Sequence, residues 1–379
     1  MKILNVNALL DPVTGGGTAE RTVQMSRALR DAGAECSIMT TDVGLTKESA
    51  LLAIEGVRVT AYRCLLKRYY LPMASYREIK RKVESVDVVH LMGHWTLLNA
   101  LVYLAVRAAR KPYVVCPAGA LRIYGRSRFL KQAYNWIVGQ RLIRNASAWV
   151  AITADERIQF EAYGVKQDKV VVIPNGIDPA DYSGEDAAEF REKHRLGESP
   201  FVLFLGRLND IKGPDILLEA FCRGQGGWPD WHLVFAGPDG GLLSALKNRA
   251  TACAARGRIH FIGYVGGTEK SSAYRAANLL VIPSRQEAMS IVVLESGILG
   301  TPVLLTDQCG FDEVARMGGG KVVPASVDGV HAGLADLLAD RRRLASMGGK
   351  LMSYVRDNYT WEIVVRKYLD LYKSLLTRA

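Results

Sequence analysis

Short apolar runs alternate along the chain with longer stretches in which apolar residues recur at helical spacing. The runs FVLFL at 201–205 and LLVI at 279–282 are apolar throughout, which is typical of strands buried on both faces of a parallel sheet. Segment 97–109 instead predicts a helix, and another helix is expected to begin near Thr18. Such alternation predicts an α/β fold with parallel sheets and crossover helices.

The predicted strands fall into two sets. The first contains 2–9, 35–40, 57–61, 86–91, 113–116, 148–152 and 170–173, and the second contains 201–205, 232–236, 259–262, 279–282, 303–305 and 320–323. A stretch rich in Pro, Gly and charge at 174–200 separates them and predicts a connection with one surface helix. A chain of 379 residues also suits two cores better than one. We therefore expect two doubly wound, Rossmann-like domains facing each other across a cleft, with the ligand at the carboxyl ends of strands.

The six cysteines and the N-terminus argue against a secreted or membrane-spanning protein. The cysteines lie at 36, 64, 116, 222, 253 and 309 without any C-x-x-C spacing, so neither a zinc site nor a disulfide framework is predicted. We expect them to be reduced core thiols of a cytoplasmic protein. The segment MKILNVNALL is expected to be a buried strand rather than a signal sequence, and no apolar stretch is long enough to cross a bilayer.

The net charge of +11 is concentrated in the first half of the chain. Residues 1–180 carry 25 Lys and Arg against 15 Asp and Glu, whereas the remainder carries 24 against 23. Aromatic residues are interleaved with these basic positions, which include Arg122, Arg126 and Arg128. One-sided charge attracts an anionic membrane, a diphosphate-bearing acceptor or nucleic acid, although ordinary solvated helix faces explain it equally well. Nucleic acid is least favoured, because no nucleic-acid-binding motif accompanies the charge.

Two cations follow the predicted strand 201–205. In FVLFLGRLNDIKGPDILLEAF, Arg207 and Lys212 leave the turn between this strand and the next helix. Fixed cations beside a helix N-terminus suit a diphosphate, which grows more negative as its bond to a sugar breaks. A solvated turn without a ligand is the alternative.

Two carboxylates separated by seven residues lie in PSRQEAMSIVVLESGILGTPVLLTD. If a helix begins near Ser290, Glu295 lies about a turn and a half inside it and is placed to accept both ribose hydroxyls. Glu287 lies in the preceding loop and is placed to meet a sugar hydroxyl near the reacting centre. The backbone N–H groups of Met289, Ser290 and Ile291 are expected to open toward a phosphate. The alternative, two unrelated surface glutamates, fits poorly because apolar residues flank Glu295.

Together G-R-x-x-x-x-K-G, E-x7-E and the following G-T-P-V resemble the retaining GT-B glycosyltransferases of family 4, over nearly the whole chain. The resemblance implies an N-terminal acceptor-binding domain at 1–178 and a C-terminal nucleotide-sugar-binding domain at 179–358. It also implies a last helix at 359–379 that packs back toward the first domain.

Further family motifs have counterparts in this sequence. The resemblance implies that a Gly-rich loop approaches the phosphates and donor sugar, with Thr18 as the cap of the following helix; the loop is Gly15, Gly16 and Gly17. A surface turn is the alternative for this loop. In the motif at 263–265, the backbone of Tyr264 and Val265 is expected to recognise the base. The P-N-G-I-D element at 174–178 is expected to be a structural hinge.

The chain departs from the family at one histidine. Relatives often show H-x-H after the fourth strand, with the second histidine touching the donor sugar. Here VVHLMGHW places Met92 at that position, with His90 before it and His94 two residues after it. His94 is expected to take over the role. The alternative, in which His90 is a core histidine and His94 an ordinary loop residue, stays open.

The resemblance also implies a reaction. No D-x-D motif is present, and many glycosyltransferases hold the donor diphosphate through a metal with that pair, so neither metal nor cofactor is expected beside the nucleotide-sugar co-substrate. The implied reaction is front-face transfer, with retention, of a hexose-type sugar from a UDP- or GDP-sugar to a sugar or lipid-linked glycan. A nucleotide-sugar epimerase of the same fold, a phosphorylase-like enzyme and a non-catalytic scaffold are alternatives. The set Arg207, Lys212, Glu287 and Glu295 favours transfer.

The acceptor is expected on the N-terminal domain. The segment VCPAGALRIYGRSRFLKQAYNW resembles transferases that build bacterial surface polysaccharides on lipid-linked diphosphate sugars. This resemblance implies that Arg122, Arg126 and Arg128 lie on the acceptor side. It also implies a cytoplasmic protein held peripherally on the anionic inner membrane face.

Overall fold

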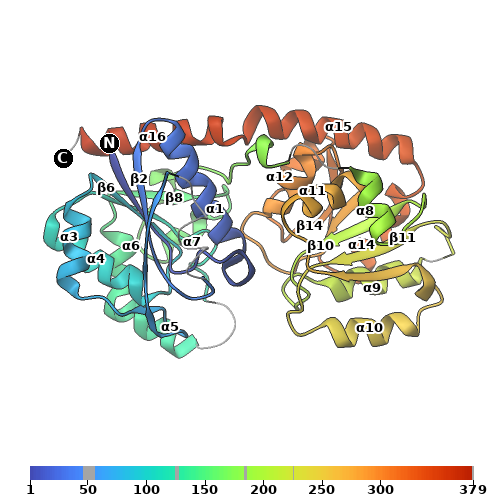
Figure 1. Cartoon of the computed structure of the whole chain (residues 1–379), viewed down its shortest axis with the longest axis horizontal. Coiled ribbons are helices and arrows are strands. Elements are labelled where there is room, and N and C mark those ends of the chain that lie inside the picture. Colours follow the sequence, from blue (N-terminus) through green and yellow to red (C-terminus); the bar gives the residue numbers. More distant parts are fainter. Residues whose placement is uncertain (46–55, 124–127, 183–185, 225, 378–379) are drawn as a thin grey trace. The chain divides into compact units, whose positions relative to one another are not determined.

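The computed structural model describes residues 1–45, 56–123, 128–182, 186–224 and 226–377 of the chain. The chain divides into two compact units (Figure 1). The first unit comprises Met1–Gly176 and Trp361–Ala379, and the second comprises Ile177–Thr360. Each unit has its own sheet with helices against it, so each is described by itself.

The first unit is built on a seven-stranded parallel sheet with the order β3-β2-β1-β6-β7-β8-β9. Its strands are β1 (Lys2–Val6), β2 (Glu35–Thr41), β3 (Arg58–Tyr62), β6 (Val88–Met92), β7 (Tyr113–Cys116), β8 (Ala148–Ala151) and β9 (Val170–Val172). A short antiparallel pair, β4 (Cys64–Leu66) and β5 (Leu71–Pro72), lies outside this sheet and was not predicted. These strands are too short to give a recognisable alternation.

Helices of the first unit begin at side chains that cap them. The Thr96 hydroxyl accepts the N–H of Asn99 at 3.1 Å and starts α4, and the Ser75 hydroxyl accepts the N–H of Glu78 at 3.2 Å and starts α3. The helices are α1 (Pro12–Asp31), α3 (Tyr76–Glu84), α4 (Leu97–Ala109), α5 (Arg128–Tyr134), the π-helix η1 (Asn135–Gly139), α6 (Gln140–Arg144), α7 (Arg157–Glu161), the 3₁₀ turn η2 (Gln167–Lys169) and α16 (Trp361–Leu376).

The last helix, α16, packs against α1 within the first unit (Figure 1). The indole N–H of Trp361 donates to Gln24 at 2.8 Å, and the fully buried Arg21 donates to Tyr368 and Asn175. A buried guanidinium needs such partners because an unpaired charge in the core is costly. These bonds hold the end of the chain to its beginning.

The second unit is built on a six-stranded parallel sheet with the order β12-β11-β10-β13-β14-β15. Its strands are β10 (Phe201–Leu205), β11 (His232–Ala236), β12 (Ile259–Gly263), β13 (Leu279–Ile282), β14 (Val303–Thr306) and β15 (Gly320–Val323). Its helices are η3 (Pro179–Tyr182), α8 (Ala187–Lys193), α9 (Pro214–Arg223), α10 (Leu243–Thr251), η4 (Arg256–Arg258), α11 (Gly267–Ala276), α12 (Ile291–Ile298), α13 (Glu313–Arg316), α14 (Val327–Leu337) and α15 (Arg341–Asn358).

The two parallel sheets confirm the predicted α/β class with two doubly wound parts. The prediction for the first strand was too long, since β1 ends at Val6 and not at Leu9. Beyond the strand end, the backbone N–H of Asn7 still donates to Met39 of β2 at 3.1 Å, while its side-chain amide donates to the hydroxyl of Thr22 in α1 at 2.8 Å. Asn7 therefore links the end of β1 both to β2 and to α1.

The prediction that all six cysteines are reduced core thiols was wrong. Cys222 and Cys253 form a disulfide with a Cα–Cα distance of 5.8 Å, and Cys64 is only partly buried. The two bonded cysteines are 31 residues apart, but α9 packs against α10, which brings the last turn of one helix beside the end of the other. Sequence spacing carries no sign of this helix pairing.

Candidate active site

The two segments with candidate chemistry follow neighbouring strands of the second unit. Arg207 comes two residues after the end of β10, and Ser284 comes two residues after the end of β13. These strands pair in parallel, so both segments leave the sheet at the same edge. The strand order reverses between β10 and β13, which is the place where doubly wound sheets bind ligands.

Glycines let the backbones come close at this edge. A Cβ on Gly237 would lie 1.9 Å from the carbonyl oxygen of Gly206, and a Cβ on Gly213 would lie 2.1 Å from that of Pro283. Gly213 also has a φ of +65°, a left-handed conformation that glycine adopts without strain. The loop from Gly206 to Gly213 is therefore packed directly on the loop that follows β13.

Lys212 and Glu287 form an ion pair across these two loops. The ammonium nitrogen of Lys212 lies 2.8 Å from Oε1 of Glu287, and the side chains are 36% and 8% exposed respectively. Burial opposes ionisation of Glu287, but the charge of Lys212 and hydrogen bonds from Lys212 and Ser284 outweigh it, so the pKa of the carboxyl is lowered. Glu287 is thus held as a buried carboxylate that can accept a hydroxyl.

Arg285 ties the same two loops together, and sequence reasoning missed it. Its guanidinium bonds both oxygens of Asp215, at 2.9 and 2.5 Å, and its backbone N–H donates to Ile211 at 2.8 Å. This two-bond pairing lowers the pKa of Asp215 although burial opposes the shift. The loop that carries Lys212 is therefore fixed to the loop that carries Glu287.

Glu295 lies inside α12 and is almost fully buried. Its carboxylate accepts hydrogen bonds from Tyr274 at 2.6 Å, from Lys270 at 2.8 Å and from Tyr182 at 3.1 Å. Burial opposes ionisation, but the charge and hydrogen bond of Lys270 and the two phenol donors lower the pKa of Glu295. These three partners of Glu295 were not predicted from the sequence. One signal was available for two of them, since Lys270 and Tyr274 are four residues apart and share a helix face.

The N-terminus of α12 lies between the two glutamates in sequence. The helix begins at Ile291, after Ser290 as its N-cap, and Met289 and Ser290 are buried. Its first turn contains no acidic residue, so no carboxylate of its own neutralises the partial positive charge there. This helix end is electrostatically suited to an anion.

The predicted base-recognition motif lies at the end of β12. Gly263 has a φ of +80°, Tyr264 is 58% exposed and Val265 is buried. A Cβ on Gly266 would lie 2.7 Å from the hydroxyl of Tyr264, so the phenol ring lies against this glycine. An exposed ring at the carboxyl edge of the sheet offers a flat apolar surface. Its contact with a base stays a prediction.

The predicted Gly-rich loop of the first unit lies at a break between two helical segments. Gly15, Gly16 and Gly17 lie within the span of α1, but the backbone of Gly16 is not helical, so a second helical segment begins just after it, close to the start predicted near Thr18. Gly16 breaks α1 into two segments, with φ 56° and ψ −145°, which only glycine adopts readily. A Cβ on Gly15 would lie 2.7 Å from that of Ala19, so this glycine permits close packing. Donor contact by these glycines stays a prediction.

His94 is enclosed in the first unit. Its Nε2 lies 3.0 Å from Oδ1 of Asn135, and the rings of Trp95, Tyr134 and Tyr163 surround it. Its Nδ1 is buried without a hydrogen-bond partner among the described residues. Burial lowers the pKa of His94 to about 4, so the imidazole is neutral at pH 7. Its contact with the donor sugar stays a prediction.

His90 has a structural environment. It is fully buried, and its Nδ1 lies 2.5 Å from the hydroxyl of Tyr372 on α16. Burial lowers its pKa to about 3. His90 therefore helps to join α16 to the sheet, as the alternative interpretation of this histidine proposed.

The predicted acceptor-side arginines lie near α5. Arg122 and Arg128 are exposed. Arg126 lies outside the described residues. The role of these three arginines toward an acceptor stays a prediction.

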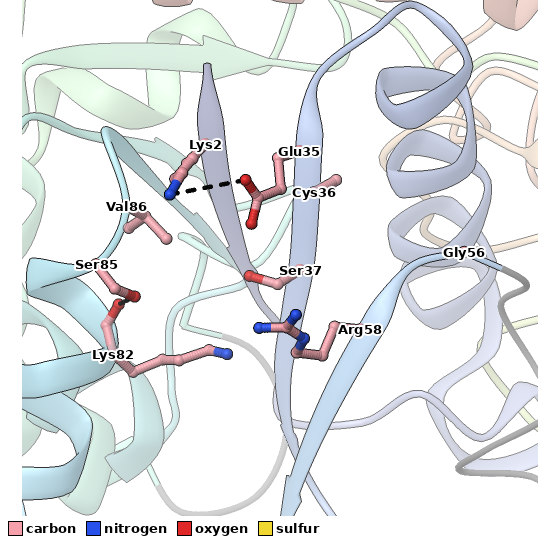
Figure 2. A pocket seen from close by; sticks show the side chains of 9 residues that line it. All are labelled: Lys2, Glu35, Cys36, Ser37, Gly56, Arg58, Lys82, Ser85 and Val86. Carbon is pink, nitrogen blue, oxygen red and sulfur yellow. Dashed lines mark hydrogen bonds and ion pairs between the residues drawn. The ribbon is translucent and has the colours of Figure 1, made fainter.

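A small pocket of the first unit contains none of the predicted site residues (Figure 2). It lies where β1, β2 and β3 begin, and Lys82 and Arg58 face its interior. Lys2 pairs with Glu35 at 3.8 Å beside it. Ligands of parallel sheets bind at the opposite, carboxyl ends of the strands, so this pocket is separate from the candidate site.

The described part of the chain offers neither a metal-binding cluster nor a membrane-spanning helix. No group of three or more His, Cys, Asp or Glu among those residues is arranged to hold a metal ion. No helix within the described ranges is both long and apolar enough to cross a membrane.

Comparison with protein families identifies the chain. Residues 186–350 match the model of glycosyl transferases group 1, and residues 16–176 match the model of the glycosyl transferase 4-like domain. The chain belongs to the family 4 glycosyltransferases. In this glycosyltransferase Arg207, Lys212, Glu287 and Glu295 all lie in the second unit, and their roles toward a donor stay predictions.

Known relatives match different shares of this glycosyltransferase. A phosphatidyl-myo-inositol mannosyltransferase of Mycolicibacterium smegmatis is 28% identical over 369 residues, 95% of this chain and 90% of the relative. A D-inositol 3-phosphate glycosyltransferase of Nocardia farcinica is 32% identical over 248 residues, but the match covers 62% of this chain and 54% of the relative. The crystal structure of Anabaena HepE with UDP and glucose has a TM-score of 0.81 at 18% identity, covering 99% of this chain and 100% of HepE. That likeness confirms the GT-B fold.

Proposed function

We propose that this glycosyltransferase moves a hexose-type sugar from a nucleotide-diphosphate donor, a UDP- or GDP-sugar, to a sugar or lipid-linked glycan acceptor. The observation that carries the proposal is the charge arrangement of the second unit. Arg207 and Lys212 follow β10, Glu287 follows β13, and the N-terminus of α12 begins four residues after Glu287. Cations and a helix N-terminus at one sheet edge suit a diphosphate.

Each residue has a role in this proposal. Arg207 and Lys212 stabilise the negative charge of the leaving diphosphate, and the backbone N–H groups from Met289 to Ile291 help to stabilise the same charge. Lys212 is paired with Glu287 at 2.8 Å, so an arriving diphosphate competes for its ammonium. The carboxylate of Glu287, ionised by its surroundings, then accepts a hydroxyl of the donor sugar.

Glu295 serves the ribose in this proposal. Its carboxylate is fixed by Lys270 and Tyr274, so it does not need to be ordered when the nucleotide arrives. The reaction breaks the bond from the anomeric carbon to the diphosphate oxygen. It forms a bond to the acceptor oxygen on the same face, so that configuration is retained. The acceptor proton passes to a donor phosphate oxygen, without a metal or a protein nucleophile.

The first unit binds the acceptor in this proposal. HepE is described as a complex with UDP-glucose, which supports the nucleotide-sugar donor. The Mycolicibacterium relative has a phospholipid in its name, which supports an acceptor that carries lipid. The basic surface with Arg122 and Arg128 suits such an anionic acceptor, as in the assembly of cell-surface polysaccharide at the inner membrane face.

Release of nucleotide diphosphate from a panel of UDP-, GDP- and ADP-sugars tests the proposal, with EDTA present and with a membrane extract as the source of acceptor. One sugar nucleotide is expected to be consumed, and NMR of the product is expected to show the anomeric configuration of the donor. Arg207→Ala is expected to lower turnover by about 10²–10³-fold, the usual effect of losing one group that stabilises the leaving charge.

The matched control is Arg316→Ala. This arginine of the same unit is 73% exposed and pairs with an exposed glutamate, so its loss is expected to leave turnover unchanged. An inverted anomer, or Arg207→Ala with the turnover of the control, would contradict the proposed mechanism. A C2-inverted sugar nucleotide without release of diphosphate would identify an epimerase instead.

A further inference from the structure

Large apolar side chains on α5 and η1 point to solvent. Phe129 is 87% exposed, Trp136 83%, Ile137 62% and Leu130 47%. Phe129 and Trp136 are seven residues apart, so they share one face of the helical segment. Exposed aromatic residues clustered in this way mark a contact surface more often than a scattered single residue does.

The other face of this segment is firmly attached to the first unit. The hydroxyl of Tyr134 donates to the carbonyl of Thr96 at 3.2 Å, and Oδ1 of Asn135 lies 3.0 Å from Nε2 of His94. The ammonium of Lys131 lies 5.5 Å from the ring centre of Trp95. The inner face is thus fixed on residues 94–96, just before α4, whereas the apolar face is exposed to solvent.

A second exposed apolar element adjoins the same place. In the β4–β5 hairpin, Leu65 is 55% exposed, Leu66 51% and Met73 58%. The carbonyl of Tyr69 in the hairpin turn accepts the N–H of Leu97, the first residue of α4, at 3.0 Å. Both exposed elements therefore flank the beginning of α4. We call α5, η1 and this hairpin the apolar rim.

The charge around the apolar rim is mostly positive, although the exposed carboxylate of Asp42 accepts the backbone N–H of Cys64 in the hairpin at 2.8 Å. Between Asp87 and Asp155 the sequence contains no acidic residue and nine Lys and Arg. Exposed basic residues lie beside both elements of the rim, and they are Arg63, Lys67, Arg68, Arg122, Arg128, Arg141 and Arg144. Apolar and aromatic side chains bordered mainly by cations match the interface of an anionic bilayer.

We infer that the apolar rim docks this glycosyltransferase on an anionic phospholipid bilayer. Phe129, Trp136 and Ile137 enter the interfacial layer, where aromatic rings are favoured, and the surrounding arginines contact lipid phosphates. The inference rests on the lipid-linked acceptor proposed above, and it gives that acceptor a place of delivery beside the first unit.

Flotation of the full chain with lipid vesicles tests the inference. The protein is expected to float with vesicles that contain phosphatidylcholine and phosphatidylglycerol in a ratio of roughly 7:3, because this content of anionic lipid attracts basic interfacial segments. It is not expected to float with vesicles of phosphatidylcholine alone. Added salt at about 0.5 M is expected to weaken the binding, because it screens the arginines. The double variant Phe129→Ser/Trp136→Ser is expected to lower the partition coefficient at least tenfold.

The control is Ile158→Ser, on α7 of the same unit. Ile158 is 55% exposed but lies outside the apolar rim, so this variant is expected to float like the wild type. Folding of every variant is checked by thermal unfolding. Equal flotation of the double variant and the wild type, or no flotation of the wild type, would overturn the inference.

Light scattering tests whether a second copy of the chain, and not a bilayer, covers the apolar rim. If the wild type is a dimer and the double variant a monomer, the rim is an interface between copies and the inference is overturned. Nucleotide binding is measured separately in the absence of lipid. Loss of flotation with intact nucleotide binding contradicts this inference alone, whereas flotation without nucleotide binding contradicts the proposed function alone.

Discussion

Removal of the Lys212 charge tests how the site holds a buried carboxylate. The side chain of Glu287 is 8% exposed, and the ammonium of Lys212 lies 2.8 Å from it. Lys212→Met keeps most of the aliphatic stem and removes the cation. Glu287 then retains the hydrogen bond from the hydroxyl of Ser284 but has lost its charged partner.

The loss of unfolding free energy expected for Lys212→Met lies between two limits. Breaking a buried ion pair costs about 3–5 kcal/mol, whereas an exposed pair contributes about 0–1 kcal/mol. The side chain of Lys212 is 36% exposed and Ser284 still donates, so we expect a loss of about 2 kcal/mol from the free energy of unfolding of the second unit. For a unit of this size that loss lowers the Tm by about 4–8 °C.

The stability that Glu287 contributes depends on pH with a definite sign. In the wild type the pKa of Glu287 is lowered, so the stability it contributes is present above the ordinary glutamate pKa and is lost as the pH falls through the lower folded value. In Lys212→Met, burial without the cation raises the folded pKa above the unfolded one. The cost of the substitution is then full at pH 7 and shrinks as the pH falls and Glu287 takes up a proton.

Calorimetry at pH 7 and pH 5 measures both effects. The double variant Lys212→Met/Glu287→Gln removes the unpaired charge and is expected to recover more than half of the lost Tm at pH 7. The reasoning would be refuted if Lys212→Met had the wild-type Tm, or if the double variant were no more stable than the single one.

Three further predictions concern the fold that carries the site. Gly213→Ala places a Cβ 2.1 Å from the carbonyl oxygen of Pro283 at a φ of +65°, so we expect it to cost more than about 2 kcal/mol in unfolding experiments, whereas Gly257→Ala, with open space around it, is expected to be neutral. Lys270→Met leaves Glu295 with phenol donors alone, and denaturation at pH 7 is expected to show a loss of about 2 kcal/mol that decreases at pH 5; an unchanged midpoint would show that the tyrosines suffice. Burial lowers the pKa of His90 to about 3 and that of His94 to about 4, so between pH 6.5 and pH 4 the unfolded chain binds protons that the folded chain does not. The Tm of the first unit is therefore expected to fall as the pH decreases over this range, and to fall less in His90→Asn. An equal decrease of Tm with pH in the two proteins would contradict the lowered pKa of His90.

The central strands were predictable because nearly all of their side chains are buried. Runs such as 201–205 and 279–282 pack between helices on both faces of the sheet, and their apolar residues mark both ends of the strand. The beginning of α1 was not predictable in the same way. Gly16 interrupts the helix with a positive φ, and a glycine triplet looks like a loop in sequence although helical backbone continues before it.

The spacing of Arg207, Lys212, Glu287 and Glu295 marked them as candidates in the sequence, but most of the side chains that hold the site together were not predictable. Asp215 and Arg285 are 70 residues apart, Lys270 and Glu295 are 25 apart, and Tyr182 and Glu295 are 113 apart. Only the packing of loops and helices in three dimensions brings these side chains together. Glu295 needed a partner by the physical rule for buried charge, but that rule does not say which residue supplies it.

Binding of nucleotides to the second unit tests the central claim most directly. Thermal unfolding of the wild type and of Arg207→Ala is measured with UDP, GDP and ADP, each with EDTA, since a ligand that binds only the folded state raises the Tm. One nucleotide diphosphate is expected to raise the Tm of the wild type and to have a much smaller effect on Arg207→Ala. A wild type that unfolds cooperatively but responds to none of the three nucleotides would contradict a donor site at Arg207 and Lys212.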